Sequence, residues 1–246
     1  MPLDVTTSQG HGASAEEEWT PETVLSTLPD RPETHTSSPV PFFHILERLK
    51  TTKREGWRRF GITSGESIAD HMYRMSIISL LAPASLKLDT SRCVKMALVH
   101  DMAESLVGDI TPVDGVPKAE KSRREEITMD YLCKDLLGNC GLVGTEEIRT
   151  LWTEYEDSKT LESQFVHDVD KIELMLQMVE YERAGKGSVD LAEFLRVGSQ
   201  IVFPQVREWF ERLVQERKAF WDSVGKRPEG VLEITPDFYK YPAVQT

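Results

Sequence analysis

Side chains suited to catalysis or metal binding gather in one segment, VKMALVHDMAESLVGDI, at positions 94–110. His100 and Asp101 are adjacent there and interrupt an otherwise apolar stretch. An imidazole beside a carboxylate is costly to bury unless the two groups are paired or bind a cation. A helical backbone would put Glu104 on the same side as both, and Asp109 follows the glycine at which the helix should end. The segment therefore predicts a paired or cation-bound cluster.

Two further segments supply groups that a cation at this cluster would need. A hard or borderline divalent cation accepts imidazole nitrogen and carboxylate oxygen together, but the adjacent histidine and aspartate can both reach it only if other helices contribute ligands. His71, in SIADHMYRMS, lies near the start of an amphipathic stretch. Asp170, in FVHDVDKIELMLQ, enters an apolar face, with His167 and Asp168 as neighbouring competitors. We expect three helices to converge on one metal site.

The elements that position these residues are expected to be helices. Apolar residues recur at helical spacing from Pro41 onward, and Gly-, Pro- and Asn-rich clusters separate the segments. Further helices are predicted at about 91–106, 118–138, 145–157, 161–184, 190–197 and 203–224. Methionines at helical spacing within them are expected to fill the core. Strand-like alternation is scarce, and VLEITPDFY near the end is the one modest candidate. The fold class is all-α, a compact bundle.

The first 39 residues differ in amino-acid composition from the rest of the chain. They are rich in Ser, Thr, Pro and Glu and contain few aliphatic residues. Such a segment cannot bury enough apolar surface to offset the entropy lost on ordering. We expect residues 1–39 to form a disordered acidic tail and residues 40–246 to form a single domain.

Composition and charge exclude several classes of partner. The net charge of −12 disfavours nucleic-acid polymers, whose binding relies on Lys and Arg displacing counterions. Nucleotides remain compatible, because a bound cation and one or two basic side chains reverse the field inside a pocket. No apolar run approaches the ~20 residues that span a bilayer, so no membrane partner is expected. The unpaired cysteines and the lack of a leader sequence favour the cytoplasm, with access to the nucleus.

The order of the candidate ligands resembles a known family. A histidine, then an adjacent His-Asp pair, then a distant aspartate is the pattern of the HD-domain metal-dependent phosphohydrolases. Four blocks resemble the 5′-deoxynucleotidase branch in particular: ESIADHMYRM, ALVHDMAESLVGDITP, PKAEKSRREE and DVDKIELMLQMVEYE. The similarity covers roughly residues 42–220. A lone HD dipeptide would be a weak signal, whereas four blocks in register are strong. The resemblance implies a helical bundle of the HD-domain type.

The resemblance also implies a role for each candidate ligand. His71, His100, Asp101 and Asp170 would bind the catalytic cation, leaving positions for a water and a phosphate oxygen. Asp170 is preferred over its neighbours because the family ligand directly precedes the sequence KIE. Mn²⁺, Co²⁺ or Mg²⁺ is expected, with Zn²⁺ as a further candidate. Two ions per subunit are compatible with the family pattern.

Glu104 and Asp109 match the family's acidic pair beside the metal. The pair would orient the attacking water or, together with the backbone carbonyl of Ile110, hold a second cation, and the two roles do not exclude each other. Glu104 acting as a general base would contribute about 10²–10⁴-fold. We therefore expect the pair to be needed for turnover.

Substrate contacts are implied at two places. Trp57 aligns with a family tryptophan beside the sugar, where packing would exclude the 2′-hydroxyl of a ribonucleotide. Gly56 precedes it where bacterial members carry arginine, and eukaryotic members share the glycine. In the absence of that arginine, Lys118, Lys121 or Arg124 would bind the phosphate.

The activity that this resemblance implies is a 5′-deoxynucleotidase, which releases phosphate from deoxyribonucleoside 5′-monophosphates. A homodimer is also implied, and amphipathic stretches such as VFPQVREWFERLV leave apolar surface for it. Two alternatives stay open. A phosphodiesterase acting on cyclic nucleotides or guanosine tetraphosphate would use a similar cluster, and so would a non-catalytic scaffold that binds nucleotide or metal. The presence of Glu104 and Asp109 argues against the scaffold, which has no evident use for them.

Overall fold

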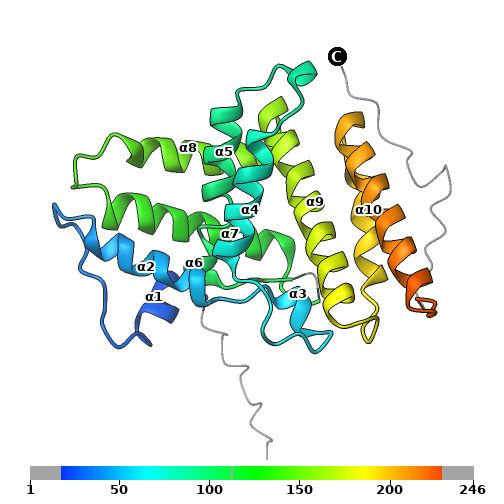
Figure 1. The fold of residues 1–246 in the computed structure, drawn as a ribbon. Helices are drawn as coiled ribbons and strands as arrows, with labels where there is room; N and C mark the ends of the chain where they lie inside the picture. Colours follow the sequence, from blue (N-terminus) through cyan, green and yellow to red (C-terminus); the bar gives the residue numbers. More distant parts are fainter. Residues whose placement is uncertain (1–17, 112, 229–246) are drawn as a thin grey trace, which may run out of the picture.

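The protein folds as a bundle of helices (Figure 1). The computed structural model describes residues 18–111 and 113–228. The only β pairing in these ranges is an isolated bridge between Lys53 and Ser67. The α-helices are α1 (Pro21–Leu25), α2 (Val40–Thr51), α3 (Glu55–Arg58), α4 (Ile68–Leu80), α5 (Thr90–Val99), α6 (Glu104–Val107), α7 (Lys118–Asp130), α8 (Gly144–Asp157), α9 (Leu161–Ala184) and α10 (Pro204–Ser223). The all-α prediction is confirmed, and the candidate strand VLEITPDFY lies outside the described residues.

Helix α9 is the centre of the bundle. It packs against α4, α5, α8 and α10, and α4 and α5 also lie side by side (Figure 1). The core between these helices contains the methionines that the sequence placed there: Met72, Met75, Met175 and Met178. Their unbranched side chains fill irregular gaps between helices. Helices α4, α5 and α9, which position the candidate ligands, thus pack directly against one another.

Capping residues explain where the two longest ligand-bearing helices begin. The Ser67 hydroxyl accepts a hydrogen bond from the backbone N–H of Asp70, whose carboxylate accepts one from the N–H of Ser67 in return. The Thr160 hydroxyl caps α9 in the same way through the N–H of Ser163. Each cap satisfies N–H groups that the first turn leaves unpaired. As a result His71 lies in the first turns of α4.

The helix predicted at about 91–106 is broken in the structure. Helix α5 ends at Val99, and α6 begins only at Glu104. Between them the N–H of Met102 bonds to the carbonyl of Val99 and the N–H of Glu104 to that of Asp101, which is the tighter i to i−3 pattern. The turn between the two helices therefore carries the His-Asp pair.

Two other predicted helices differ in the structure. The helix expected over 118–138 divides into α7 and a π-helical turn, η2 (Tyr131–Leu136). The segment expected over 190–197 is a 3₁₀ helix, η3 (Ala192–Gln200). A second 3₁₀ helix, η1 (Ala84–Leu86), follows α4. Helix α9 has the predicted bounds.

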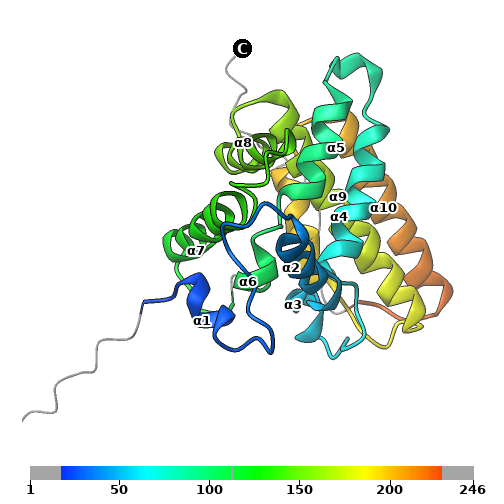
Figure 2. The ribbon, with the colours of Figure 1, turned by 90° about the vertical axis from the view of Figure 1, so that its left-hand side faces the viewer.

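The prediction of a disordered tail over residues 1–39 is wrong for residues 18–39. Helix α1 forms there and packs against α6 and α7 (Figure 2). Leu25 is 3% exposed, and the backbone carbonyl of Trp19 accepts a hydrogen bond from Arg123. A few apolar anchors thus order a segment whose average composition is polar. Residues 1–17 lie outside the described part of the chain.

No helix within residues 18–111 and 113–228 combines the length and the apolar character that crossing a bilayer requires.

Candidate metal centre

Three segments bring the four predicted ligands together. His71 comes from α4, His100 and Asp101 from the turn after α5, and Asp170 from the middle of α9. The Nε2 atom of His71 lies 3.3 Å from Asp170 Oδ1 and 3.7 Å from Asp101 Oδ2. The Nε2 atom of His100 lies 3.2 Å from the same oxygen of Asp101. Ligand atoms of His71, His100 and Asp101 all lie within 4.8 Å of one another, a spacing that one ion could span.

Hydrogen bonds on the far side of each imidazole orient its Nε2 atom toward this cluster. Nδ1 of His71 lies 2.6 Å from Glu173 Oε2, and Nδ1 of His100 lies 3.0 Å from the carbonyl oxygen of Ala97. In a neutral imidazole the nitrogen facing such an acceptor carries the hydrogen, which leaves a lone pair on Nε2. A carboxylate or carbonyl behind a histidine is the usual arrangement for a metal ligand.

The charges of the cluster suit a divalent cation. Burial alone would raise the pKa of Asp101 and Asp170, but the neighbouring histidines and Arg54 outweigh it and hold both pKa values well below the usual range. Both carboxylates are therefore ionised. Nε2 of His71 is fully buried and makes no hydrogen bond among the described residues. An orphaned nitrogen beside two carboxylates fits an imidazole and carboxylate coordination site.

His71 must release a proton to bind an ion. Burial and Arg54 lower the pKa of His71, but Asp170 and Glu173 overcome them and raise it to about 9. A metal ligand must be a neutral imidazole, so metal binding would expel this proton.

Glu104 and Asp109 lie beside the cluster, as predicted. Glu104, at the start of α6, is 2% exposed, and its Oε2 atom has no hydrogen-bond partner among the described residues. Burial, together with Asp101 and Asp109, raises the pKa of Glu104 well above its usual value. Asp109 Oδ2 accepts a hydrogen bond of 2.6 Å from the backbone N–H of Glu55. Asp109 is therefore fixed in place, whereas Glu104 retains an unused acceptor.

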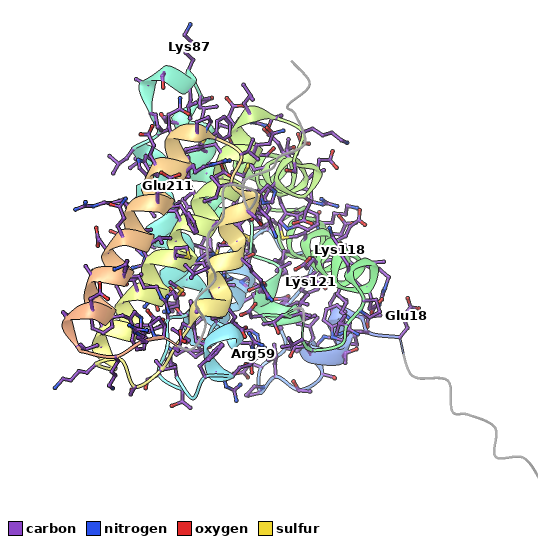
Figure 3. All side chains as sticks on the ribbon, turned by 90° about the vertical axis from the view of Figure 1, so that its right-hand side faces the viewer. Glu18, Arg59, Lys87, Lys118, Lys121 and Glu211 are labelled. Atoms are coloured by element: carbon purple, nitrogen blue, oxygen red, sulfur yellow. The ribbon has the colours of Figure 1, made fainter. Side chains whose placement is uncertain are left out.

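A cavity of about 820 Å³ opens onto these residues. Its wall includes candidate ligands and the acidic pair: His100, Asp101, Glu104, Asp109, Ile110 and Asp170. Basic residues also line it: Arg54, Arg59, Lys118, Lys121, Lys171 and Arg196. Lys118 and Lys121 from α7 and Arg59 from the segment after α3 lie along one side of the molecule (Figure 3). This volume is within the usual range for small-molecule sites, about 300–1,000 Å³.

The predicted substrate residues divide into two groups. Trp57 lines the cavity, its Nε1 donates to Glu66 at 2.9 Å, and its ring packs 4.7 Å from that of Phe194. Lys118 is exposed on the cavity wall. Arg124 is not part of that wall among the described residues.

Arg124 is instead occupied on the outer side of α7. Its side chain bonds to Glu120 at 2.7 Å and lies 5.5 Å over the ring of Trp19. The structure does not bring it to the substrate cavity. The sequence could not anticipate this, because it gave no sign that residues 18–39 would fold against α7.

The proposed second ion has a competitor at one of its ligands. The Nζ atom of Lys121 donates to the backbone carbonyl of Ile110 at 3.1 Å. It also lies 3.9 Å from Glu104 and 3.5 Å from Glu125. Lys121 therefore already supplies positive charge where that ion would lie.

The competitors of Asp170 serve other purposes. Asp168 is fully buried and accepts hydrogen bonds from the backbone N–H groups of Val202 and Phe203. His167 is half-buried, and its Nε2 lies 3.0 Å from the carbonyl oxygen of Tyr155. Asp168 therefore holds the segment before α10 and His167 contacts α8, whereas Asp170 lies at the cluster.

Sequence reasoning missed three residues that surround the cluster. Glu173 holds His71, Tyr155 places its ring 4.8 Å from that of His100, and Arg54 donates to Asp101 at 3.2 Å. A signal existed for Glu173, which follows Asp170 by one helical turn on α9. No periodic pattern distinguishes Arg54 from its basic neighbours.

In this helical bundle, imidazole and carboxylate groups from three segments meet beside a cavity. This arrangement is typical of a metal-binding protein. The chain belongs to the HD domain family, because a family model of that description matches residues 46–208, more than half of the chain.

Two yeast 5′-deoxynucleotidases are similar to this chain over most of their length. The 5′-deoxynucleotidase hdd1 of Schizosaccharomyces pombe is 47% identical over 76% of this chain and 94% of its own. The 5′-deoxynucleotidase YGK1 of Saccharomyces cerevisiae is 41% identical over 83% of this chain and 93% of its own. A solved structure of the HD domain-containing protein YGK1 superposes with a TM-score of 0.61, at 33% identity, over 83% of this chain and all of that one.

Proposed function

We propose that this protein is a metal-dependent 5′-deoxynucleotidase, which hydrolyses deoxyribonucleoside 5′-monophosphates to deoxyribonucleosides and phosphate. The observation that carries the proposal is the convergence of His71, His100, Asp101 and Asp170, the last three of which line one cavity together with the acidic pair. The names of the similar yeast proteins support the same activity.

The residues around the cluster divide the work. A bound divalent cation lowers the pKa of water and neutralises charge on phosphoryl oxygens. Glu104 offers an unpaired carboxyl oxygen. A cation bound beside it would favour its ionised form, in which it would hold the attacking water in line and accept its proton. The hydrogen bond from the backbone N–H of Glu55 holds the Asp109 carboxylate in one position on the cavity wall. No covalent nucleophile is needed.

The sugar is placed against the aromatic wall of the cavity. Trp57 is 1% exposed and is held by Glu66, Tyr181 and Phe194, so it cannot yield to an additional hydroxyl. A close-packed wall is intolerant of added volume. We propose that this rigidity favours deoxyribose over ribose.

The cation is Mn²⁺, Co²⁺ or Mg²⁺ in this proposal, with Zn²⁺ as a further candidate. Nitrogen and oxygen donors suit all of them, and availability in the cell decides among such ions. A second ion at Glu104, Asp109 and the carbonyl of Ile110 would require the ammonium group of Lys121 to move. We place the protein in the cytoplasm, with access to the nucleus.

We also propose a homodimer, but not through the surface that the sequence indicated. The apolar residues of VFPQVREWFERLV mostly face the core: Phe203, Val206, Phe210 and Leu213 are buried. Exposed apolar side chains lie instead on α2, α4 and α5: Phe43, Tyr73, Ile77, Leu80 and Leu98. These residues are the better candidates for an interface.

Phosphate release tests the proposed activity. The purified protein is freed of metal, supplied with Mn²⁺, Co²⁺ or Mg²⁺, and given dAMP, dCMP, dGMP and dTMP beside their ribose counterparts. We expect release from the deoxynucleotides with a preference over ribose. Hydrolysis of cyclic nucleotides or guanosine tetraphosphate instead would identify a phosphodiesterase, and inertness toward every substrate would favour a scaffold.

A further inference from the structure

We propose that η3 is the part of the cavity wall that binds the nucleobase, with Val197 and Gln200 in contact with the base. The inference rests on the proposed function, because it assumes that a deoxynucleotide occupies the cavity. η3 lies between α9 and α10 in the chain, and four of its side chains line the cavity: Phe194, Arg196, Val197 and Gln200. The ligand cluster and Trp57 account for the phosphate and the sugar, so the base remains to be placed.

The geometry of a 3₁₀ helix sorts the side chains of η3 into three rows. With three residues per turn, side chains at i and i+3 lie above one another. One row is buried in the core: Ala192, Leu195 and Gly198. A second row lies at the surface: Glu193, Arg196 and Ser199. The third row lines the cavity: Phe194, Val197 and Gln200. In an α-helix this row would rotate by about 120° over the same six residues, which would take its far end away from the cavity.

Buried carboxylates of α9 fix both ends of this wall. Before η3, the backbone N–H of Leu191 donates to Glu182 at 2.9 Å. After η3, the backbone N–H groups of Val202 and Phe203 donate to Asp168 at 2.9 and 2.8 Å. Neither carboxylate is exposed. The proposed metal ligand on α9 lies between the two, so the wall has a fixed position relative to the ligand cluster.

The attachment at Glu182 is itself tied to α10. Arg217 donates two hydrogen bonds of 2.9 Å to Glu182, and the indole N–H of Trp221 donates a third at 2.8 Å. Gly198 brings η3 against the same helix, since a Cβ atom there would lie 2.1 Å from the ring of Phe210. Charge-assisted hydrogen bonds within a buried network hold their groups firmly. A wall that is fixed before the ligand arrives loses little conformational entropy on binding.

The position of Trp57 indicates where the base lies. The phosphate and the base are attached to different carbons of the sugar, on either side of its ring oxygen. With the phosphate at the ligand cluster and the sugar against Trp57, the base therefore extends beyond Trp57, away from the cluster. The ring centroid of Phe194 lies 4.7 Å from that of Trp57, and the cavity-lining row continues from Phe194 to Val197 and Gln200. The base is expected along this row.

The side chains on this part of the wall suit a base better than those on α7 and α8. A base has flat apolar faces and polar edges. Val197 and, on α9, Leu174 are partly buried apolar residues of the cavity wall. The wall along α7 and α8 instead carries ionisable side chains: Lys118, Lys121, Glu125 and Glu156. A neutral base in contact with them would remove water without offering a counter-charge. The chemistry therefore favours η3.

Gln200 ends the row with a side chain that can serve any base edge. Its amide carries both donors and an acceptor. The side chain makes no hydrogen bond with the other described residues, so both are available. Rotation of the amide by half a turn exchanges donor and acceptor. We therefore expect the wall to accept purines and pyrimidines alike.

Comparison of dAMP with deoxyribose 5-phosphate, which lacks the base, isolates the contacts of η3. The variants are Val197→Ala, Gln200→Ala and the two combined. Ser199→Ala, on the surface row of the same helix, is the matched control. Gln200 is exposed, so its variant keeps the test valid if Val197→Ala is unstable.

Binding is measured by calorimetry on the Mn²⁺-loaded full-length chain, with Glu104→Ala as the parent so that the ligand is not consumed. The other three deoxynucleotides are titrated as well. The kcat and KM for both compounds are measured with Glu104 present, and bound manganese and circular dichroism report on the fold.

We expect the parent to bind dAMP about tenfold or more tightly than deoxyribose 5-phosphate, through the apolar area that the base buries and one net hydrogen bond. The double variant should lose most of this difference through dAMP alone. Its KM for dAMP should rise at unchanged kcat, because contacts to the base are made equally in ground state and transition state. Bound manganese and the Ser199→Ala control should match the parent.

Equal losses of affinity for dAMP and deoxyribose 5-phosphate would overturn the proposal, since η3 would then only shape the site. Unchanged dAMP affinity in the folded double variant would overturn it as well, as would a parent that binds both compounds equally, binds neither or accepts a single base. If dAMP binds through Val197 and Gln200 but the protein with Glu104 hydrolyses no nucleotide, the proposed function fails and the assignment of η3 stands.

Discussion

At the scale of single residues, both candidate histidine ligands depend on a hydrogen-bond partner behind the imidazole ring. His71 is oriented by Glu173, which Arg74 holds in turn through a hydrogen bond of 2.7 Å. His100 is oriented by a backbone carbonyl of its own helix. Outer partners of this kind typically matter about 10–100-fold for metal affinity or activity. The site therefore extends beyond the residues that would touch an ion.

Replacing Glu104 by alanine separates binding from chemistry. The carboxylate lies beside the cluster but is not one of the four proposed ligands, so bound metal should remain. Turnover of dAMP should fall by about 10²–10⁴-fold, the usual contribution of a general base. Metal analysis and phosphate release on the same sample check this. Loss of metal and activity together would show that Glu104 is itself a ligand of the ion.

Glu125 should make stability depend on pH. Burial, with help from Glu156 and Asp101 and against Lys121, raises its pKa from 4.5 to about 7. A buried acid with a raised pKa binds its proton more tightly in the folded state, so the folded state loses stability as the pH rises from 4.5 to 7. Glu125→Gln should therefore gain about 3 kcal/mol over wild type by pH 8 and nothing near pH 4.

Urea unfolding of the metal-free proteins at several pH values measures this difference. Glu126→Gln, which changes the exposed neighbour of Glu125, is the control and should follow wild type throughout. A difference between Glu125→Gln and wild type that stays constant with pH would contradict the assignment of the raised pKa to Glu125.

At the scale of elements, helix caps place the ligands. The N–H of His71 bonds to the carbonyl of Ser67, so the first turn of α4 positions this imidazole directly. The first turns of a helix are its least stable part when uncapped. Metal affinity should therefore respond to the cap of α4 more than to that of α9, whose ligand lies ten residues beyond Thr160.

A comparison of two cap substitutions tests this. Ser67→Ala and Thr160→Ala should each lower the free energy of unfolding by about 1 kcal/mol. Only Ser67→Ala should also weaken Mn²⁺ binding, as measured by calorimetry. Equal effects of the two substitutions on metal affinity would show that the cap of α4 has no special role at the site.

Much of the element level was accessible from sequence. The apolar period predicted α9 with its bounds and predicted α10 within one residue, because long amphipathic helices average over many residues. The break between α5 and α6 was missed because a tight turn keeps the same apolar spacing over so few residues. Arg54 was missed and Arg124 was misplaced because charge alone does not tell which way a side chain points.

At the scale of the whole molecule, the cavity differs in charge from the chain around it. Six basic and six acidic residues line the cavity, so its wall is balanced in charge, whereas the chain as a whole carries a net charge of −12. The N-terminal segment contributes from the outside, because α1 packs on α6 and α7, which carry Glu104 and Lys121. It acts as part of the domain rather than as an appendage.

The buried residue of α1 provides the test. Leu25→Ala should cost about 2–5 kcal/mol in unfolding free energy, as for other buried leucines. Thr27→Ala, on the exposed side of the same segment, should cost under about 0.5 kcal/mol. If Leu25→Ala were as neutral as Thr27→Ala in urea unfolding, residues 18–39 would not be packed in solution.

The central claim is that imidazole and carboxylate groups from three helical segments share one ion. Bound Mn²⁺ per chain, measured for wild type, Asp170→Ala and Asp168→Asn, tests it most directly. Wild type and Asp168→Asn should retain the ion, whereas Asp170→Ala should stay folded, lose affinity by about 10–100-fold or more and release no phosphate from dAMP. Wild-type metal affinity in Asp170→Ala would contradict the account.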